Sequence, residues 1–256
     1  MHELIEGIVG QRIKRRETSS ERYGDFLDIL LDQTKECGPD DFDREDVIIL
    51  LADLFIGGTD TTTTTMEWVM AELLHNPNMM AKAKQELVET IGKEKTIEEK
   101  DIIQLPYLQS ILKETMRLHT TAPLLLPHKA KMDIEICGYT IPKDTKVLVN
   151  AWALARDPKY WDDPTEFLPE RFMKLGIDFR GTCFYYVPFS SGRRICPGLG
   201  LGVRMMSLLL ASLIHQFDWK LPNGMAINDM DMSDQFGTTL QKATPLTAIP
   251  LLASSS

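Results

Sequence analysis

Cysteine is scarce in this 256-residue chain, and the cysteines that it has are widely scattered. The four cysteines are Cys37, Cys137, Cys183 and Cys196, and no two of them form a C-x-x-C pair. This number and spacing exclude a disulfide-rich scaffold and argue against a zinc knuckle. We therefore expect reduced cysteines, as in an intracellular setting, with any special cysteine working singly.

Long uninterrupted apolar runs are lacking as well. A membrane span needs about 18 to 20 apolar residues, but the run that begins at Val47 is broken by Asp53, and the run 205–214 contains two serines. Residues 1–16 mix charged and apolar side chains, unlike a signal peptide. We expect no membrane anchor, and a start in the middle of a helical pattern favours a truncated chain.

Basic residues are outnumbered by acidic ones. Lys and Arg total 28 against 37 Asp and Glu, which gives a formal net charge of −9. Proteins whose main task is to coat nucleic acid are usually basic, so no nucleic-acid partner is expected. The content of 43% hydrophobic and 25% charged residues is typical of a folded chain with one large domain or two small ones.

Apolar spacing predicts a mainly helical first half. Asp43 is placed to cap a helix of about thirty residues that ends at Asn76-Pro77, and its apolar sides predict a buried central strut. Thr96 with Glu99 resembles a capping box for a short helix. Further helices are expected at 1–16, 26–31, 79–91 and 106–119.

The pattern changes after Pro123. Short apolar runs punctuated by Pro, Gly and Asp predict strands. The aromatic and Pro-rich stretch 157–190 has little periodicity, and long irregular segments are usually functional. A long final helix is expected at 198–216, followed by weak strand signals up to Leu252. The fold class is therefore mainly α with a minor β portion, the expected strands being 124–126, 134–136, 139–141 and 147–149.

The strongest chemical signal surrounds Cys196. This residue precedes Pro197, and Pro is favoured at the first position of a helix. The thiol is therefore expected at the positive end of the final helix, where a thiolate is favoured. Neighbouring arginines offer partners for carboxylates, and glycines permit close approach of a large flat group, a combination that suits haem: Gly192, Arg193, Arg194 and Gly198. The alternative is a buried structural cysteine beside a basic surface pair.

The centre of the long helix is composed of poor helix formers. Gly57 and Gly58 each cost about 0.5–1 kcal/mol relative to Ala, and five β-branched threonines follow at 61–65. A local widening that opens a pocket for a small ligand would account for them, with Asp60 beside Thr61. The alternative is a packing face whose threonine hydroxyls bond to backbone carbonyls.

Four motifs together resemble the cytochrome P-450 family. The spacing F-x-x-G-x-R-x-C-x-G at 189–198 resembles its haem-binding loop, although Ser190, Gly200 and Gly202 stand where Gly, Pro and Ala are common. The segment 57–62 resembles the motif A/G-G-x-D/E-T-T/S. Glu114 and Arg117 match E-x-x-R, where an ordinary exposed ion pair is the alternative, and 169–172 matches P-E-R-F.

The resemblance assigns roles to individual residues. It implies that Cys196 is the axial thiolate of haem b and that Arg194, and less distinctly His128, meet haem propionates. Phe189 would pack near the thiolate, while two glycines would permit the loop geometry, Gly192 and Gly198. The thiolate would favour cleavage of the O–O bond.

It also implies roles away from the thiolate. Asp60 and Thr61 would deliver protons for dioxygen activation. Glu114, Arg117 and Arg171 would form a buried network that locks the irregular segment. Three segments would line an apolar substrate pocket: 51–56, 120–126 and 236–239.

By this resemblance, residues 1–256 are the C-terminal portion of one cytochrome P-450 domain, without the N-terminal anchor and early helices. The motif wording is similar to plant geraniol 8-hydroxylases and ferruginol synthases. It implies a monooxygenase acting on a lipophilic molecule such as a terpenoid, with dioxygen and with electrons from NADPH through cytochrome P-450 reductase. The full-length relative would lie at the cytosolic face of the endoplasmic reticulum membrane. A truncated fragment unable to hold haem is the rival, and a haem sensor or electron carrier is a weaker third.

Overall fold

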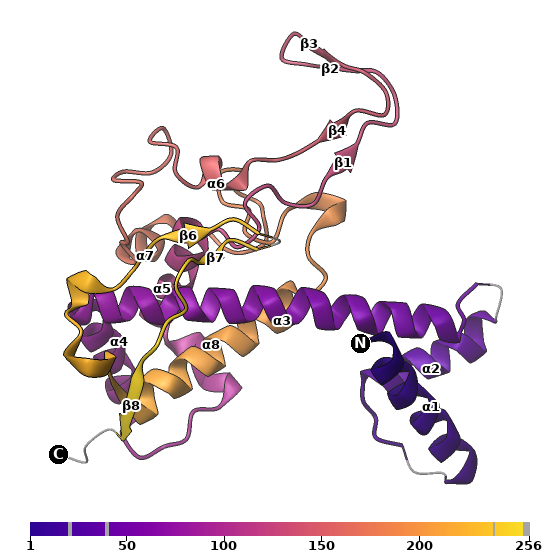
Figure 1. Cartoon of the computed structure of the whole chain (residues 1–256), viewed down its shortest axis with the longest axis horizontal. Coiled ribbons are helices and arrows are strands. Elements are labelled where there is room, and N and C mark those ends of the chain that lie inside the picture. The colour runs from indigo at the N-terminus through magenta and orange to yellow at the C-terminus, as the bar shows by residue number, and fades with distance from the viewer. Residues whose placement is uncertain (20–21, 39–40, 238, 253–256) are drawn as a thin grey trace. The chain divides into compact units, whose positions relative to one another are not determined.

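The computed structural model describes residues 1–19, 22–38, 41–237 and 239–252 (Figure 1). Helices dominate it: α1 His2–Thr18, α2 Phe26–Cys37, α3 Arg44–His75, α4 Pro77–Thr90, α5 Pro106–Leu118, α6 Ala151–Leu154, α7 Glu170–Leu175 and α8 Leu199–Gln216. Short 3₁₀ helices lie at Glu99–Gln104, Gly192–Arg194, Pro222–Gly224 and Ile227–Asp229.

The strands form antiparallel pairs of two. The pairs are β1 His128–Lys129 with β4 Lys146–Val147, β2 Ile134–Ile136 with β3 Tyr139–Ile141, β5 Phe217–Lys220 with β8 Ile249–Leu252, and β6 Asp234–Gln235 with β7 Gln241–Lys242. The β2–β3 hairpin turns at Cys137 and Gly138, both with positive φ (51° and 81°), as tight hairpin turns require. The predicted class, mainly α with a minor β portion, is confirmed.

The chain divides into two compact units, Met1–Asp60 and Thr61–Ser256, and the boundary falls inside α3. The first unit has an apolar core of its own, built from α1, α2 and the beginning of α3. Arg12 joins α1 to the start of α2, because its guanidinium donates to Asp25 at 2.7 Å and to Asp28 at 3.1 Å. The core side chains of this unit are Ile5, Val9, Leu27, Leu30, Leu31, Val47 and Ile48.

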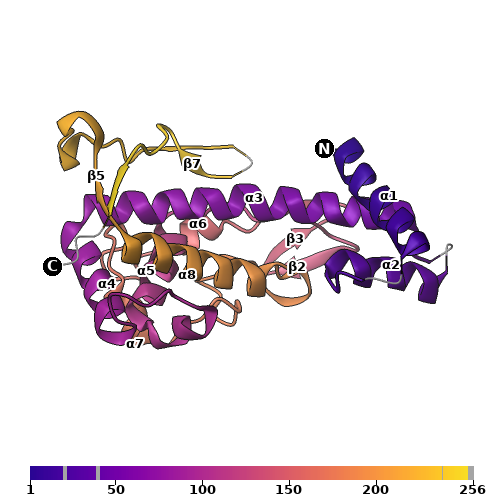
Figure 2. The same ribbon diagram turned by 90° about the horizontal axis from the view of Figure 1, so that it is seen from below.

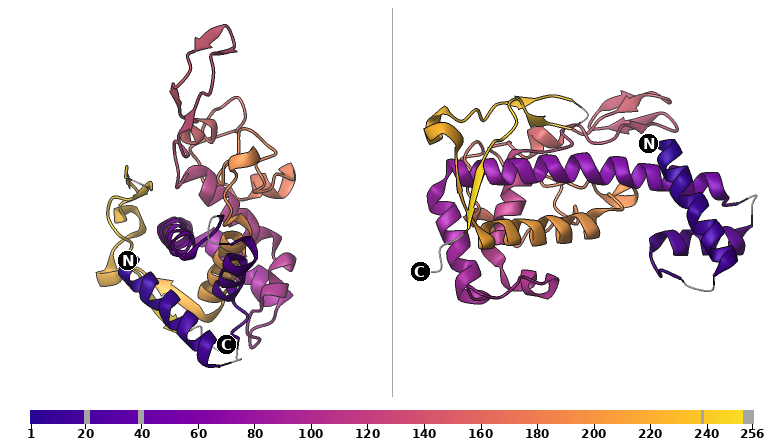
Figure 3. Two further views of the ribbon diagram at one scale, coloured as in Figure 1. Left: turned by 90° about the vertical axis from the view of Figure 1, so that its right-hand side faces the viewer. Right: turned by 60° about the horizontal axis from the view of Figure 1, so that its bottom comes forward.

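The second unit is organised around α5, which packs against α4, α7 and α8 (Figure 2). Figure 3 shows α8, in orange, running alongside the C-terminal part of α3. The Glu86 carboxylate of α4 accepts hydrogen bonds from Tyr107 N at 2.7 Å and Leu108 N at 2.9 Å. It thereby caps the exposed N–H groups at the start of α5.

The long helix has the predicted bounds but not the predicted burial. Asp43 and Asp46 form a reciprocal cap in which each carboxylate accepts the other's backbone N–H at 3.0 Å. Residues 64–74 are buried except for the half-buried Glu67, yet residues 53–60 are exposed, and Phe55 and Ile56 each keep 55% exposure. The buried-strut prediction is therefore wrong for the centre of α3. The expected widening is also wrong, because every residue from 44 to 75 is α-helical.

Two local predictions are wrong for reasons of turn chemistry. The capping box of the short 3₁₀ helix is formed by Glu98 and Asp101 rather than by Thr96 and Glu99. The segment 124–126 is a turn and not a strand, since Leu125 has a φ of 50° and its N–H donates to the carbonyl of Ala122 at 3.2 Å. Apolar composition alone does not distinguish a strand from an apolar turn.

Two helices, α3 and α8, are long and apolar enough to cross a membrane by length and composition. Their best 18-residue windows have mean hydropathies of 1.2 and 1.3. The prediction that no segment reaches this level is wrong, because a windowed average tolerates isolated charges that interrupt a continuous run. Core helices of soluble proteins pass the same test, so the result is weak support for a membrane span.

Candidate functional site

The cysteine loop is closed by backbone hydrogen bonds across residues 187–196. The N–H of Cys196 donates to the carbonyl of Phe189 at 2.9 Å, and the N–H of Ser190 donates to the carbonyl of Val187, also at 2.9 Å. Ser190 and Gly192 adopt positive φ values of 64° and 63°. The loop therefore returns on itself and delivers Cys196 to the start of α8.

Gly181 supports this loop, and sequence reasoning missed it. A Cβ atom on Gly181 would lie 2.4 Å from the Ser190 carbonyl oxygen and 2.9 Å from Cβ of Ser191. Gly181 also has a φ of 66°. Any side chain here would displace the cysteine loop, but a lone glycine in an irregular segment carries no sequence signal of such a contact.

Cys196 is half-buried immediately before the first turn of α8. Its carbonyl accepts the N–H of Leu199 at 3.3 Å, and α8 begins at Leu199. Pro197 therefore lies in the turn before the helix, which corrects the prediction that it occupies the first helical position. The thiol remains close to the amino end of an 18-residue helix, where the helix dipole favours a thiolate.

Phe189 packs beside the beginning of α8. Its ring meets that of Phe179 edge to face, with centroids 6.0 Å apart. A Cβ on Gly202 would lie 3.9 Å from the Phe189 ring. At this distance a side chain as small as that of Ala, which is common here in the family motif, would make an ordinary van der Waals contact with Phe189.

The two predicted propionate partners lie on separate elements. Arg194 is exposed at the end of the 3₁₀ helix Gly192–Arg194, and its side chain makes no hydrogen bond or ion pair among the described residues. His128 is half-buried on β1, opposite Val147 of β4.

The donor chemistry at Cys196 fits a haem better than a protein-enclosed metal ion. Across the described ranges, no group of three or more His, Cys, Asp and Glu side chains could hold a metal ion. A Cβ on Gly198 would stand 3.7 Å from Sγ of Cys196, so Gly198 leaves one side of the sulfur uncovered. A single sulfur donor beside an exposed guanidinium suits haem. Haem supplies four further ligands to its iron and carries carboxylates that a guanidinium can bind.

Asp60 and Thr61 lie next to each other on α3, and Asp60 is exposed while Thr61 is half-buried. The carbonyl of Thr61 accepts a hydrogen bond from Oγ1 of Thr65 at 2.8 Å. This contact is the hydroxyl-to-carbonyl pattern considered as the alternative for the threonine run. At Thr65 the alternative interpretation therefore holds, while a role of Asp60 and Thr61 in proton delivery stays a prediction.

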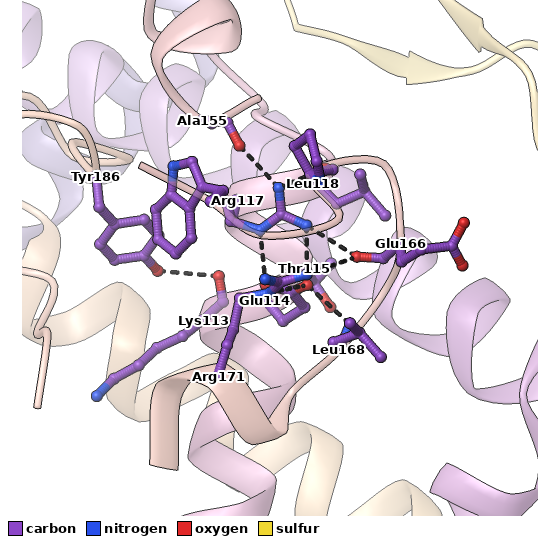
Figure 4. A network of polar contacts seen from close by, with 12 residues as sticks. Lys113, Glu114, Thr115, Arg117, Leu118, Ala155, Glu166, Leu168, Arg171 and Tyr186 are labelled. Carbon is purple, nitrogen blue, oxygen red and sulfur yellow. Dashed lines mark hydrogen bonds and ion pairs between the residues drawn. The ribbon is translucent and has the colours of Figure 1, made fainter. Parts of the chain in front are cut away.

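Glu114, Arg117 and Arg171 meet in the core of the second unit (Figure 4). The Glu114 carboxylate accepts two hydrogen bonds from Arg117, at 2.7 and 2.8 Å, and one from Nε of Arg171 at 2.9 Å. It also accepts the backbone N–H of Leu168 at 2.8 Å. The side chains of Glu114 and Arg117 are completely buried.

The arginines of this network bind the irregular segment through its carbonyls. Arg117 donates to the carbonyls of Ala155 and Pro164, each at 2.7 Å, and to that of Glu166 at 3.0 Å. Arg171 adds the carbonyl of Asp162 at 2.7 Å. The network thereby supplies hydrogen-bond partners to backbone that lies outside helices and strands.

A second buried polar group, which sequence reasoning missed, joins α3 to the end of α5. His119 stacks on Trp68 with ring centroids 3.8 Å apart and an interplanar angle of 8°. Its Nε2 lies 2.6 Å from Oε1 of Glu72. Burial lowers the pKa of His119 below its ordinary value of 6.5, an effect that outweighs the rise caused by the hydrogen bond to Glu72.

Residues 1–246 match the family model for cytochrome P450, and the chain therefore belongs to the cytochrome P450 family. It is 49% identical over 247 residues to the geraniol 8-hydroxylase of Catharanthus roseus, covering 96% of this chain and 50% of that protein. It is likewise 49% identical over 248 residues to the geranylhydroquinone 3''-hydroxylase of Arnebia euchroma, covering 97% of this chain and 50% of that protein.

A solved structure, a zebra fish cytochrome P450 with abiraterone, superposes with a TM-score of 0.83 at 30% identity. The match covers 98% of this chain and 59% of the zebra fish chain. The chain thus spans about half the length of the curated relatives it matches. Their names place it near the geraniol 8-hydroxylase group of plant P450s, as its motifs predict.

Breaking the buried network is expected to be strongly destabilising. Arg117→Met leaves the Glu114 carboxylate buried with fewer partners, which costs about 3–5 kcal/mol. The free energy of unfolding in urea measures this loss. Lys82→Met is the matched control, because it removes an exposed ion pair with Glu170 worth about 0–1 kcal/mol. Equal effects of the two substitutions would contradict the structural role of Arg117.

Stability is also expected to depend on pH through His119. Because its pKa is lowered in the folded state, the unfolded chain takes up this proton at higher pH than the folded chain does. The stability gained by keeping His119 neutral in the folded state is therefore complete above about pH 6.5. It is lost as the pH falls below that value. Urea unfolding between pH 8 and pH 5 should show this loss, and His119→Gln should reduce it. His2→Gln, which removes an exposed histidine, should leave the profile unchanged; identical profiles for all three proteins would refute the assignment.

Proposed function

We propose that this chain forms the thiolate-ligating part of a haem-dependent monooxygenase that inserts one atom of dioxygen into a lipophilic small molecule. The observation that carries this proposal is the closed loop that holds Cys196 at the amino end of α8. Family membership and relatives named as hydroxylases support it.

In this proposal haem b is held mainly by the loop 189–198. Cys196 would supply the thiolate ligand of the iron, and the guanidinium of Arg194 and the imidazole of His128 would pair with propionates. Phe189 shields the sulfur of Cys196 from water. Gly192 and Gly198 have no side chains, so a flat group can approach the backbone closely. When bound, a haem with a thiolate ligand supplies O–O bond cleavage and oxidation of an unactivated carbon.

Asp60 and Thr61 are the proposed proton-delivery pair. The hydroxyl of Thr61 holds a water molecule or donates its own proton, and the carboxyl of Asp60 replaces that proton from solvent. The exposure of Asp60 supports this exchange with water. A proton relay of this kind typically contributes about 10²–10⁴-fold to a reaction.

The proposed substrate is a terpenoid or a related plant metabolite. Support comes from the relatives, which are named as hydroxylases of geraniol and geranylhydroquinone. Predominantly apolar composition in the three predicted pocket segments, 51–56, 120–126 and 236–239, suits such a molecule. Residue 238 of the last segment lies outside the described residues.

The proposed electron donor is NADPH-cytochrome P450 reductase, acting at the cytosolic face of the endoplasmic reticulum membrane. Arg193 is exposed next to the proposed haem ligand. A positive side chain at this place suits an acidic face of a flavoprotein, because complementary charge steers association.

A specific observation favours the rival, a fragment that cannot hold haem alone. The chain spans about half of its curated relatives, and α3 exposes Leu54, Phe55 and Ile56 in succession. Exposed apolar side chains that follow one another around a helical turn indicate a surface that another part of a protein covers.

Haem ligation by Cys196 is tested by the spectrum of the reduced, carbon monoxide-treated chain. A strongly red-shifted Soret band is expected from the wild type supplied with haem. Cys196→Ser should abolish this band, because a hydroxyl does not replace the thiolate. Cys183→Ser, which alters another half-buried cysteine, should retain it.

The same measurement separates the two proposals. A band that appears only when the chain is preceded by the amino-terminal half of the Catharanthus geraniol 8-hydroxylase would support the rival proposal, in which the chain alone cannot hold haem. Absence of the band in both forms would overturn haem-thiolate function.

Proton delivery is tested by Thr61→Ala. The substitution is made in the chain alone or in the chain with the added amino-terminal half, whichever gives the red-shifted band. Loss of the hydroxyl should lower product formed per NADPH consumed by about tenfold or more, with the missing electrons released as hydrogen peroxide. Thr63→Ala, two residues further along the same helix, is the control. Unchanged coupling of NADPH to product in Thr61→Ala would refute the proton-delivery role.

A further inference from the structure

One face of α3 contacts the predicted pocket segment 120–126 and the residue directly after the predicted pocket segment 236–239. Thr65, Trp68 and Glu72 are spaced three and four residues apart, so their side chains share one face of the helix. All three are buried, with exposed fractions of 2%, 0% and 5%. Polar side chains buried on one helix face need partners from the segment that covers them.

The residues that follow α5 are the first of these partners. Oγ1 of Thr65 lies 3.0 Å from Oγ1 of Thr121. Trp68 and Glu72 engage His119 through the ring stack and the 2.6 Å hydrogen bond already described. The start of the 119–126 segment is therefore fastened to α3 over two helical turns.

The loop before β7 is held at the same place. Nε1 of Trp68 donates to the carbonyl of Leu240 at 3.2 Å, and the N–H of Leu240 donates to the carbonyl of Thr121 at 2.9 Å. Thr121 thus contacts α3 through its side chain and the neighbouring loop through its backbone.

The hydroxyl bonds at Thr65 have a defined direction. A threonine hydroxyl has one hydrogen to donate, and Thr65 donates it to the carbonyl of Thr61 at 2.8 Å. Thr121 must then be the donor in the bond between the two hydroxyls. The order Thr121 to Thr65 to Thr61 connects the pocket segment with the backbone carbonyl of the residue whose hydroxyl is proposed to deliver protons.

We propose that Thr65 is a positioning residue that fixes the 119–126 segment relative to Thr61, and thereby sets which carbon of the lipophilic substrate is oxidised. The inference rests on the proposed function, because a positioned substrate presupposes the oxidation. Valine has the shape of threonine but lacks the hydroxyl. Thr65→Val therefore removes the link between Thr61 and Thr121 with little change in packing.

The test uses Thr65→Val and Thr121→Val, with Thr65→Ser restoring the hydroxyl and Thr64→Val as control. Thr64 is a neighbouring buried threonine. The host is the form that gives the red-shifted band, with geraniol as the probe. Both valine variants should keep that band but change the ratio of hydroxylated products about threefold or more. Thr65→Ser should restore the wild-type ratio, and the double valine variant should match the single variants.

Hydrogen exchange provides a readout independent of activity. Amides at 119–126 should exchange faster in Thr65→Val than in Thr64→Val. Unchanged product ratios in both valine variants, or a Thr64→Val effect as large as that of Thr65→Val, would overturn the inference while leaving the proposed function intact. A wild-type protein without the thiolate spectrum would instead refute the proposed function and the inference with it.

Discussion

The buried carboxylate of Glu114 is the constraint on which the second unit depends. A charge removed from water must be matched by nearby donors, and Glu114 obtains its donors from Arg117, Arg171 and the backbone of Leu168. Arg117 in turn donates to carbonyls of the irregular segment. The carboxylate accepts hydrogen bonds from the guanidinium groups, which in turn donate to backbone carbonyls. Backbone that lacks the hydrogen bonds of a helix or strand is thereby held in the core.

The same helix, α5, also supports the approach to the cysteine loop. The hydroxyl of Tyr186 donates to the carbonyl of Lys113 at 3.0 Å, and the loop begins directly after Tyr186. Gly181 then lets the chain pass close to Ser190, and the ring of Phe179 packs against that of Phe189. The position of Cys196 therefore follows from contacts on three sides that are absent from the ligand motif itself.

Helix α3 combines a centre made of weak helix formers with a buried C-terminal part. Its central residues are small or β-branched, a composition that weakens a helix, while its C-terminal part is buried among α4, α5 and α8. The carboxylate cap between Asp43 and Asp46 and the packing of Trp68 and Leu73 stabilise its two ends. Stable ends allow a poor helix-forming centre to stay α-helical, which is why composition predicted a widening that the helix does not have.

The sequence by itself determined the helical class, the bounds of the longest helices and the pairing of Glu114 with Arg117, because periodicity, caps and short motifs are local. Arg171 was added to this pair only by the family resemblance. Only the tertiary structure decided the exposure of residues 53–60, the turn at Leu125, and the partners of His119, Thr65 and Gly181. Those properties depend on residues far away in the chain. Burial, ring stacking and close backbone approach are properties of pairs, and no local pattern in one sequence encodes the distant partner.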